Sequence, residues 1–316
     1  TNKAGHGPAW ANSLFEDNAE HGFGMLLGQN AVRNRLIAKV EAIAESDKAS
    51  DEVKAAAKAF LDTKDDVKTN GAAADALADA IKDIDCADCK DIVENKEFLS
   101  KKSVWIFGGD GWAYDIGFGG VDHVLASGEN VNIMVFDTEV YSNTGGQASK
   151  ASQIGQVAQF AAAGKSIAKK SLAEIAMSYG YVYVAQIAMG ANMNQTIKAI
   201  EEAEAYPGPS IVIAYAPCEM HSIKGGMVNC QKEMKRAVEC GYWNLFRFNP
   251  AADKKFTLDS KAPAGGYREF LMNEARYSRL TREFPERAEG LFTRNEDAAK
   301  ERYEHLTKLI DLYDKQ

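Results

Sequence analysis

The sequence lacks the features that mark nucleic-acid-binding, membrane-spanning and exported proteins. Its 316 residues contain 37 Lys and Arg against 45 Asp and Glu, a formal net charge of −8, which argues against a nucleic-acid-binding surface. No apolar run approaches the roughly 18 residues that a transmembrane helix requires. The N-terminus has no basic segment followed by an apolar one, as a signal peptide would. We therefore expect a cytoplasmic protein whose partners include neither nucleic acid nor a membrane.

Cysteines are also few, and their number is odd. Five cysteines at irregular spacing argue against a disulfide framework and favour free thiols or metal ligands. Cys86 and Cys89 form a C-x-x-C pair, but one such pair supplies only half of a tetrahedral metal site. We therefore favour a structural role for this pair. We assign no role to Cys230 and Cys240. The five are Cys86, Cys89, Cys218, Cys230 and Cys240.

The chain begins without methionine, in residues typical of a loop, so we expect it to be a piece of a longer polypeptide. Four segments differ in pattern. Residues 1–29 are irregular, 30–99 form a Lys- and Asp-rich helical insert, 100–250 form an α/β core, and 251–316 form helices that wrap the surface. Within the insert, the apolar spacing predicts three helices. They cover 30–45, a stretch beginning at a capping Asp51, and 72–82.

The core alternates short apolar runs, rich in β-branched and aromatic residues, with helical stretches. This alternation predicts βαβ units and a buried parallel sheet, an α/β fold. We expect the Lys169–Lys170 pair to lie on a solvated helix face and His221 to be a solvated or locally bonded loop residue. The predicted strands are 104–107, 131–136, 181–187 and 210–215. The predicted helices between them are 112–127, 172–179 and 193–205.

The segment VWIFGGDGWAYDIG places Asp110 between two glycines at the end of the first predicted strand. The carboxyl edge of a parallel sheet is where α/β proteins bind ligands. A helix-capping aspartate in a glycine turn would explain the segment. A dinucleotide fingerprint would need glycine at Tyr114, whose ring blocks close packing of helix on strand. A Mg²⁺–diphosphate site would need a second oxygen ligand, and Thr138 follows the next predicted strand 28 residues later.

Longer motifs carry a resemblance to a known family. GDGWAYDIG followed by DTEVYSNTGGQASK resembles the C-terminal thiamine-diphosphate-binding domain of pyruvate:ferredoxin (flavodoxin) oxidoreductase. PAWANSLFEDNAEHGFGM (Pro8–Met25) and YAPCEMHSIKGGM (Tyr215–Met227) are similar to the same family. The resemblance runs from Pro8 to about Pro250. Most thiamine enzymes have two asparagines where this chain has Asp137-Thr138, which fits the oxidoreductase branch.

The resemblance implies a role for each matching residue. Asp110, Thr138 and the Val140 carbonyl would bind Mg²⁺, and Asn143 would act in catalysis near the thiazolium. Cys218 would be one ligand of a [4Fe–4S] cluster, with the other three lying upstream of Thr1. The residues implied to bind the cofactor are Gly109, Asp110, Gly111, Trp112, Thr138, Glu139, Val140, Tyr141, Ser142 and Asn143.

The implied activity is the oxidative decarboxylation of pyruvate, a 2-oxo acid, to CO₂ and acetyl-CoA. Electron transport would run through [4Fe–4S] clusters to ferredoxin or flavodoxin, with coenzyme A as co-substrate. The partners implied are the remaining domains of the same oxidoreductase and a second copy in a homodimer. Two alternatives stay open. A non-oxidative thiamine-dependent decarboxylase or synthase would not need Cys218, and a non-catalytic subunit would keep the fold without the cofactor.

Overall fold

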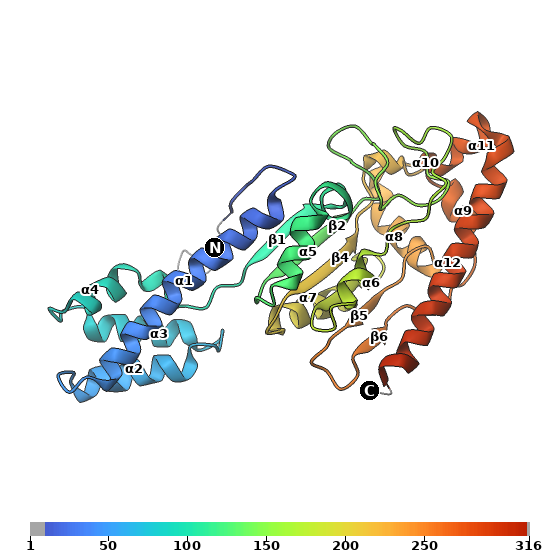
Figure 1. The fold of residues 1–316 in the computed structure, drawn as a ribbon. Helices are drawn as coiled ribbons and strands as arrows, with labels where there is room; N and C mark the ends of the chain where they lie inside the picture. Colours follow the sequence, from blue (N-terminus) through green and yellow to red (C-terminus); the bar gives the residue numbers. More distant parts are fainter. Residues whose placement is uncertain (1–9, 315–316) are drawn as a thin grey trace. The chain divides into compact units, whose positions relative to one another are not determined.

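The computed structural model describes residues 10–314. These residues divide into two compact units. One unit comprises residues 10–21 and 105–314 and contains the sheet, whereas the other comprises residues 22–104 and is helical. Both units can be followed along the chain in Figure 1 by their colours.

The helical unit, residues 22–104, overlaps the predicted insert (30–99), whereas residues 18–29, predicted to be irregular, belong to the first helix. Its apolar core includes Leu36, Phe60, Leu77 and Ile92, all fully buried. The second helix is capped by Ser50, whose hydroxyl accepts a hydrogen bond from the Val53 amide at 3.3 Å; the predicted cap, one residue later, was wrong. The elements are α1 (Asn18–Glu45, which starts before the unit), α2 (Asp51–Thr63), α3 (Asn70–Ile81), α4 (Ala87–Glu94) and the 3-10 helix η1 (Lys96–Phe98).

The other unit is built on one six-stranded sheet, ordered β1-β2-β4-β3-β5-β6. The four predicted strands form its parallel part. Two further strands add to it antiparallel. Each is three residues long, too short for the period-two alternation by which strands are predicted. The strands are β1 (Trp105–Gly109), β2 (Asn132–Asp137), β3 (Tyr183–Ile187), β4 (Ser210–Tyr215), β5 (Phe246–Phe248) and β6 (Phe256–Leu258).

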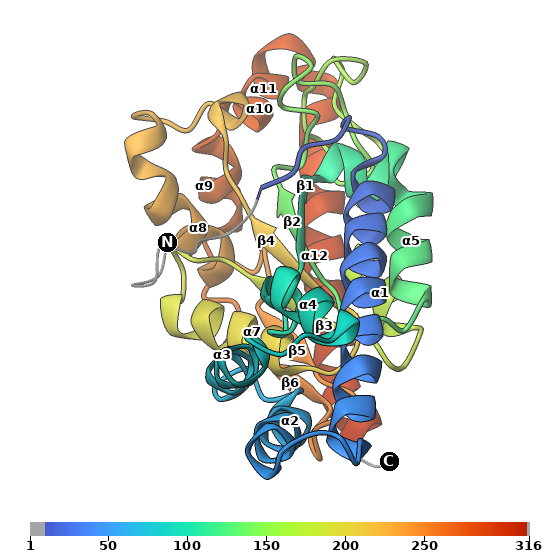
Figure 2. The same ribbon diagram turned by 90° about the vertical axis from the view of Figure 1, so that its left-hand side faces the viewer.

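Helices connect and cover these strands. The long α12 lies along the antiparallel edge, where Tyr313 packs against Phe248 and Phe256; Figure 2 shows it in red. The predicted helix over 112–127 is divided into a π-helix and an α-helix. The elements are η2 (Gly111–Ile116, π), α5 (Phe118–Ala126), α6 (Leu172–Met177), α7 (Met193–Ala205), η3 (Glu219–His221), η4 (Met227–Asn229), α8 (Cys230–Glu239), α9 (Tyr267–Met272), α10 (Ala275–Ser278), α11 (Leu280–Glu283) and α12 (Pro285–Asp314).

The strand register brings three chain segments to one edge of the sheet. Gly109 at the end of β1 pairs with Phe136 of β2, and Asp137 at the end of β2 pairs with Tyr215 of β4. The residues that follow these strands therefore leave the sheet side by side. This confirms the expectation that Asp110 and Thr138 follow neighbouring parallel strands.

Candidate functional site

Asp110 lies at the centre of the candidate site, with 1% of its surface exposed. Its Oδ1 accepts hydrogen bonds from the Thr138 amide at 3.1 Å and hydroxyl at 2.7 Å, and its Oδ2 accepts one from the Ser149 hydroxyl at 2.7 Å. Asp110 stands at the N-cap of η2, yet its side chain makes no capping hydrogen bond. The interpretation of this residue as a helix cap was therefore wrong.

Three oxygens that the family resemblance implies as Mg²⁺ ligands lie close together here. The Thr138 hydroxyl oxygen lies 2.7 Å from Asp110 Oδ1 and 2.9 Å from the Val140 carbonyl oxygen. The Ser142 hydroxyl donates to the same Thr138 oxygen at 2.9 Å. Because the Thr138 hydroxyl has one proton, it can donate to only one of its two acceptors at a time. The cluster thus has more oxygen acceptors than hydrogen-bond donors. A hard cation, which binds oxygen ligands, would suit it.

Lys169 acts on the charge of Asp110 from a distance and lowers its pKa, but it pairs with Asp137 and Glu139 instead. Among residues 10–314, no lysine, arginine or histidine forms an ion pair with Asp110. Burial raises the pKa of Asp110 to about 7, and the negative charge of Asp137 adds to the rise, although hydrogen bonds from Thr138 and Ser149 oppose it. The charged form of this carboxylate is therefore poorly stabilised by the protein itself.

Glu139 lies between Thr138 and Val140 in the chain, and unlike Asp110 it is bound by positive side chains. Its carboxylate is fully buried and binds Arg276 Nη1 at 2.8 Å, Lys169 Nζ at 3.3 Å and the Tyr242 hydroxyl. Burial alone would raise the pKa of Glu139, but Lys169 and Arg276 overcome this effect and lower the pKa to about 2. Since both of its oxygens are bound within the protein, its predicted contact with a cofactor stays a prediction.

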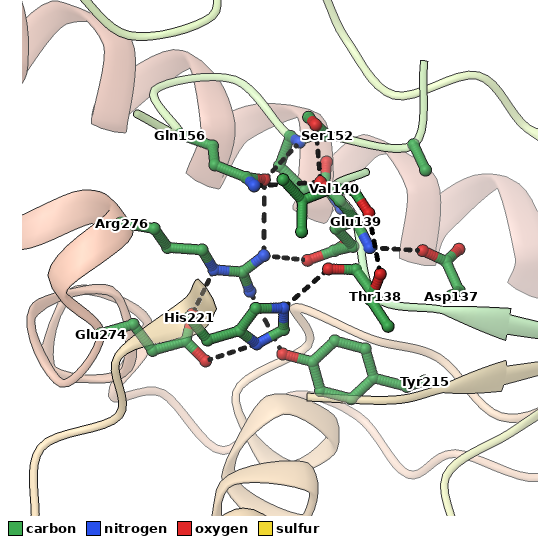
Figure 3. A network of polar contacts seen from close by, with 12 residues as sticks. Asp137, Thr138, Glu139, Val140, Ser152, Gln156, Tyr215, His221, Glu274 and Arg276 are labelled. Carbon is green, nitrogen blue, oxygen red and sulfur yellow. Dashed lines mark hydrogen bonds and ion pairs between the residues drawn. The ribbon is translucent and has the colours of Figure 1, made fainter. Parts of the chain in front are cut away.

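Lys169 was expected on a solvated helix face, and this was wrong. It lies in a loop, its side chain is 11% exposed, and it binds Asp137 at 2.7 Å as well as Glu139. His221 is likewise fully buried, and its Nε2 lies 2.7 Å from the Thr138 carbonyl oxygen. Figure 3 shows how His221 and Arg276 approach the loop after β2. Sequence patterns missed the burial and contacts of these residues because each lies far along the chain from the loop it contacts.

The predicted aromatic and glycine residues pack around the start of η2. Trp112 is 1% exposed, and its ring lies so close to Gly108 that a Cβ there would meet it at 2.2 Å. A Cβ on Gly111 would meet the Tyr141 ring at 2.6 Å, whereas one on Gly109 would meet nothing closer than 4.0 Å. The backbone at Gly109 is therefore accessible to a ligand, and Gly111 is required for the packing of Tyr141.

A contact between Ser142 and Cys218 joins the loop after β2 to the segment that follows β4. The Cys218 sulfur lies 3.3 Å from the Ser142 hydroxyl oxygen, and that hydroxyl donates a hydrogen bond to the Thr138 hydroxyl oxygen. Asn143, the predicted catalytic residue, is exposed one residue further along. The structure thus brings Cys218 to the oxygen cluster, and the roles predicted for it and for Asn143 stay predictions.

The remaining cysteines lie outside this site. Cys86 is the N-cap residue of α4 and Cys89 is buried in its first turn. Hydrogen bonds from the Cys89 amide and thiol lower the pKa of Cys86, whereas burial raises that of Cys89 to about 11. Among residues 10–314 there is no cluster of three or more His, Cys, Asp or Glu side chains able to hold a metal ion, and no helix there is both long and apolar enough to cross a membrane.

Comparisons with known proteins agree with the motifs. Residues 95–214 match the family described as thiamine pyrophosphate enzyme, C-terminal TPP binding domain. Over 98% of its length, the chain is 51% identical to a pyruvate-flavodoxin oxidoreductase of Klebsiella pneumoniae and 50% identical to a pyruvate:ferredoxin oxidoreductase of Moorella thermoacetica. A probable pyruvate-flavodoxin oxidoreductase of Escherichia coli is 46% identical, also over 98% of the chain.

The chain is much shorter than these relatives. It covers 27% of the first two proteins and 26% of the third, or about a quarter of their length. The matching family region contains β1, the loop after β2 and the whole oxygen cluster around Asp110. The chain therefore carries a C-terminal domain of the thiamine pyrophosphate enzymes and, over nearly all of its length, is homologous to about a quarter of the pyruvate:ferredoxin and pyruvate:flavodoxin oxidoreductases, as its motifs predict.

Proposed function

We propose that this chain is the part of a pyruvate oxidoreductase that holds thiamine diphosphate and Mg²⁺. The observation that carries the proposal is Asp110, a buried carboxylate without a protein cation, placed where two further oxygens converge. The homology to pyruvate:ferredoxin and pyruvate:flavodoxin oxidoreductases supports the choice of pyruvate as substrate.

The residues present fit a Mg²⁺ ion bound to a diphosphate. Asp110, Thr138 and Val140 would supply a carboxylate, a hydroxyl and a carbonyl oxygen, the hard ligands that Mg²⁺ prefers. Such an ion would also provide the positive charge that Asp110 lacks. The open backbone at Gly109 allows the close approach that a diphosphate needs, and Gly111 and Trp112 begin the helical segment behind it.

When bound, thiamine diphosphate supplies an electron sink for the decarboxylation of a 2-oxo acid. The contribution of this chain is to hold the ion and the diphosphate in place and to exclude water around them. Val140 in the loop is buried, as are Trp112 and Tyr114 in η2, and the Tyr114 hydroxyl donates to Asp137 at the end of β2. Asn143, Tyr141 and Ser142 continue the loop, and we propose that Asn143 contacts the substrate.

The oxidative part of the reaction requires groups beyond this chain. Cys218 would supply one thiolate to a [4Fe–4S] cluster, which needs three more ligands. The electrons would pass through such clusters to ferredoxin or flavodoxin, and the acyl group would pass to coenzyme A. The remaining domains of the oxidoreductase and a second copy in a homodimer would complete the assembly.

Two alternatives are less favoured. A non-oxidative decarboxylase would have no need of Cys218, yet its sulfur lies 3.3 Å from Ser142, a hydrogen-bonded neighbour of Thr138. A non-catalytic subunit would not need to keep a buried carboxylate unneutralised, since such a group destabilises a protein unless it is paired.

The test is a calorimetric titration of the full-length protein with thiamine diphosphate in the presence of Mg²⁺. We expect Asp110→Ala to weaken binding at least about 100-fold, because a Mg²⁺ ligand is lost. Asp115→Asn serves as the matched control, since Asp115 follows in the same helix but already pairs with Lys150. Binding by Asp110→Ala within twofold of the unmodified protein would contradict the proposal.

A further inference from the structure

Glu139 has an unusual backbone for its residue type. Its φ is 59°, in the left-handed region, where a residue other than glycine costs on the order of 1 kcal/mol or more. Glycine would adopt this conformation without strain. A fully buried glutamate at this position therefore persists because its side chain and backbone are held by their surroundings.

Arg276 holds the Glu139 carboxylate together with Lys169 and the Tyr242 hydroxyl. It lies in α10, 137 residues further along the chain, and is 3% exposed. A guanidinium has five N–H donors in a rigid plane, and here each of the five has an acceptor within 3.4 Å. Figure 3 shows the contacts with Glu274, Glu139, Gln156 and Tyr215. The acceptors are Glu274, Glu139, Gln156, Tyr215 and Tyr242.

The backbone around Glu139 is fixed as completely as its side chain. Its backbone carbonyl oxygen accepts hydrogen bonds from the Ser152 hydroxyl at 2.6 Å and from the side-chain amide of Gln156 at 3.0 Å. Its amide donates to Asp137 Oδ1 at 3.2 Å, and the preceding carbonyl, that of Thr138, contacts His221. These contacts restrain the backbone on both sides of Glu139.

The conformation of Glu139 determines where its neighbours point. Thr138 and Val140 precede and follow it, and they are two of the three residues that we propose bind Mg²⁺. A change of φ at Glu139 would turn the Thr138 hydroxyl and the Val140 carbonyl relative to each other, and the 2.9 Å contact between them would be lost.

We propose that Arg276 is the positioning residue of the cation site, because by holding the Glu139 carboxylate it keeps the Thr138 and Val140 oxygens directed at Asp110. This inference rests on the proposed Mg²⁺ site and adds to it a residue from a distant helix. Arg276 itself need not contact the ion or the cofactor. Its planar, fixed donors matter, and the single ammonium of lysine cannot replace them.

The test measures Mn²⁺ binding by electron paramagnetic resonance in the full-length protein, at saturating thiamine diphosphate and without substrate. Arg276→Lys keeps the charge but loses the five-donor plane, and we expect it to weaken Mn²⁺ binding about 10-fold or more, as replacement of residues behind metal ligands does. If this variant does not fold, Glu139→Gln, which keeps the size of the side chain, is measured in its place, with the same expected result.

Arg247→Lys is the matched control. Arg247 is also buried and binds Asp259 through two nitrogens, each at 2.9 Å, and Glu202 at 2.6 Å, but it lies on β5 and contacts no residue of the loop after β2. This substitution removes a similar buried ion pair and should lower the thermal unfolding temperature to a similar extent. We expect it to leave Mn²⁺ affinity unchanged.

The outcomes separate the two proposals. Weaker Mn²⁺ binding in Arg276→Lys, with unchanged binding in Arg247→Lys, supports the positioning role. Unchanged binding in a folded Arg276→Lys or Glu139→Gln variant overturns that role, as would an equal loss in Arg247→Lys. In the same assay, Asp110→Asn should abolish binding; if it does not, the cation site itself is wrong, whatever the Arg276 variants show.

Discussion

Asp110 and Glu139 are two buried carboxylates of the same site in opposite electrostatic conditions. Glu139 is held between Arg276 and Lys169, and these cations lower its pKa to about 2. Asp110 receives hydrogen bonds from neutral groups alone, and burial raises its pKa to about 7. Among residues 10–314, two cations pair directly with Glu139 and none pairs directly with Asp110.

We interpret Glu139 as a structural carboxylate and Asp110 as one that binds a ligand. A buried charge with protein counter-charges fixes a conformation, whereas a buried charge without them is an unfavourable feature unless a ligand completes it. Burial and residue type alone would not distinguish the two residues. The positions of Arg276 and Lys169 do, and the following predictions test that distinction.

The largest effect on folding is expected at Glu139. Glu139→Ala leaves Arg276 and Lys169 facing an empty volume, and we expect the free energy of unfolding to fall by about 3 kcal/mol. Urea denaturation of the protein without cofactor measures this change. Glu239→Ala, which removes an exposed pair with Lys235, should cost under about 1 kcal/mol. Equal losses in the two variants would show that Glu139 is not a structural anchor.

Ligand binding should stabilise the protein through Asp110. At Mg²⁺ and thiamine diphosphate concentrations 100 times the dissociation constant, mass action raises the free energy of unfolding by about 2.7 kcal/mol. We expect this rise in the unmodified protein and none in Asp110→Asn, as measured by the shift in thermal unfolding temperature. An equal shift in both proteins would mean that the ligand binds elsewhere.

Without ligands, Asp110→Asn should have the reverse effect and stabilise the fold by about 1 kcal/mol, because it removes a buried charge. The asparagine Oδ1 can accept both hydrogen bonds from Thr138, and its Nδ2 can donate to the Ser149 hydroxyl oxygen. The gain depends on pH, since the pKa of Asp110 rises from 3.8 in the unfolded chain to about 7 in the fold.

The direction of that dependence follows from the sign of the shift. A raised pKa means that the folded state binds the proton more tightly, so the contribution of Asp110 to stability is full below pH 4 and is lost as pH rises through 7. The stabilisation by Asp110→Asn should therefore be small at pH 4 and reach its maximum above pH 7. Unfolding curves from pH 4 to 8 measure it, and a gain that shrinks as pH rises would contradict the assigned shift.

The placement of Asp110 beside Thr138 could be predicted from the sequence because it depends on local patterns. Each strand pattern ended at a chemically distinctive residue, and parallel pairing of β1 with β2 necessarily brought Asp110 next to Thr138. The short antiparallel β5 and β6 and the π-helical turn at Gly111 had no such pattern and were not foreseen.

The supporting side could not be predicted, because its contacts join residues far apart in the chain. Arg276 belongs to a segment whose charge suggested a surface helix, and the Lys169–Lys170 pair suggested a solvated face. Their burial becomes understandable only once Glu139 and Asp137 are placed opposite them. Charge patterns indicate exposure on average, and a buried ion network is the exception that only the tertiary structure reveals.

The most direct test of the account is a crystal structure of the full-length protein with thiamine diphosphate and Mn²⁺, read by the anomalous signal of the metal. We predict one peak about 2.1 Å from Asp110, the Thr138 hydroxyl and the Val140 carbonyl, with Glu139 still bound to Arg276. A metal bound elsewhere, with Asp110 keeping its present hydrogen bonds to Thr138 and Ser149, would contradict it.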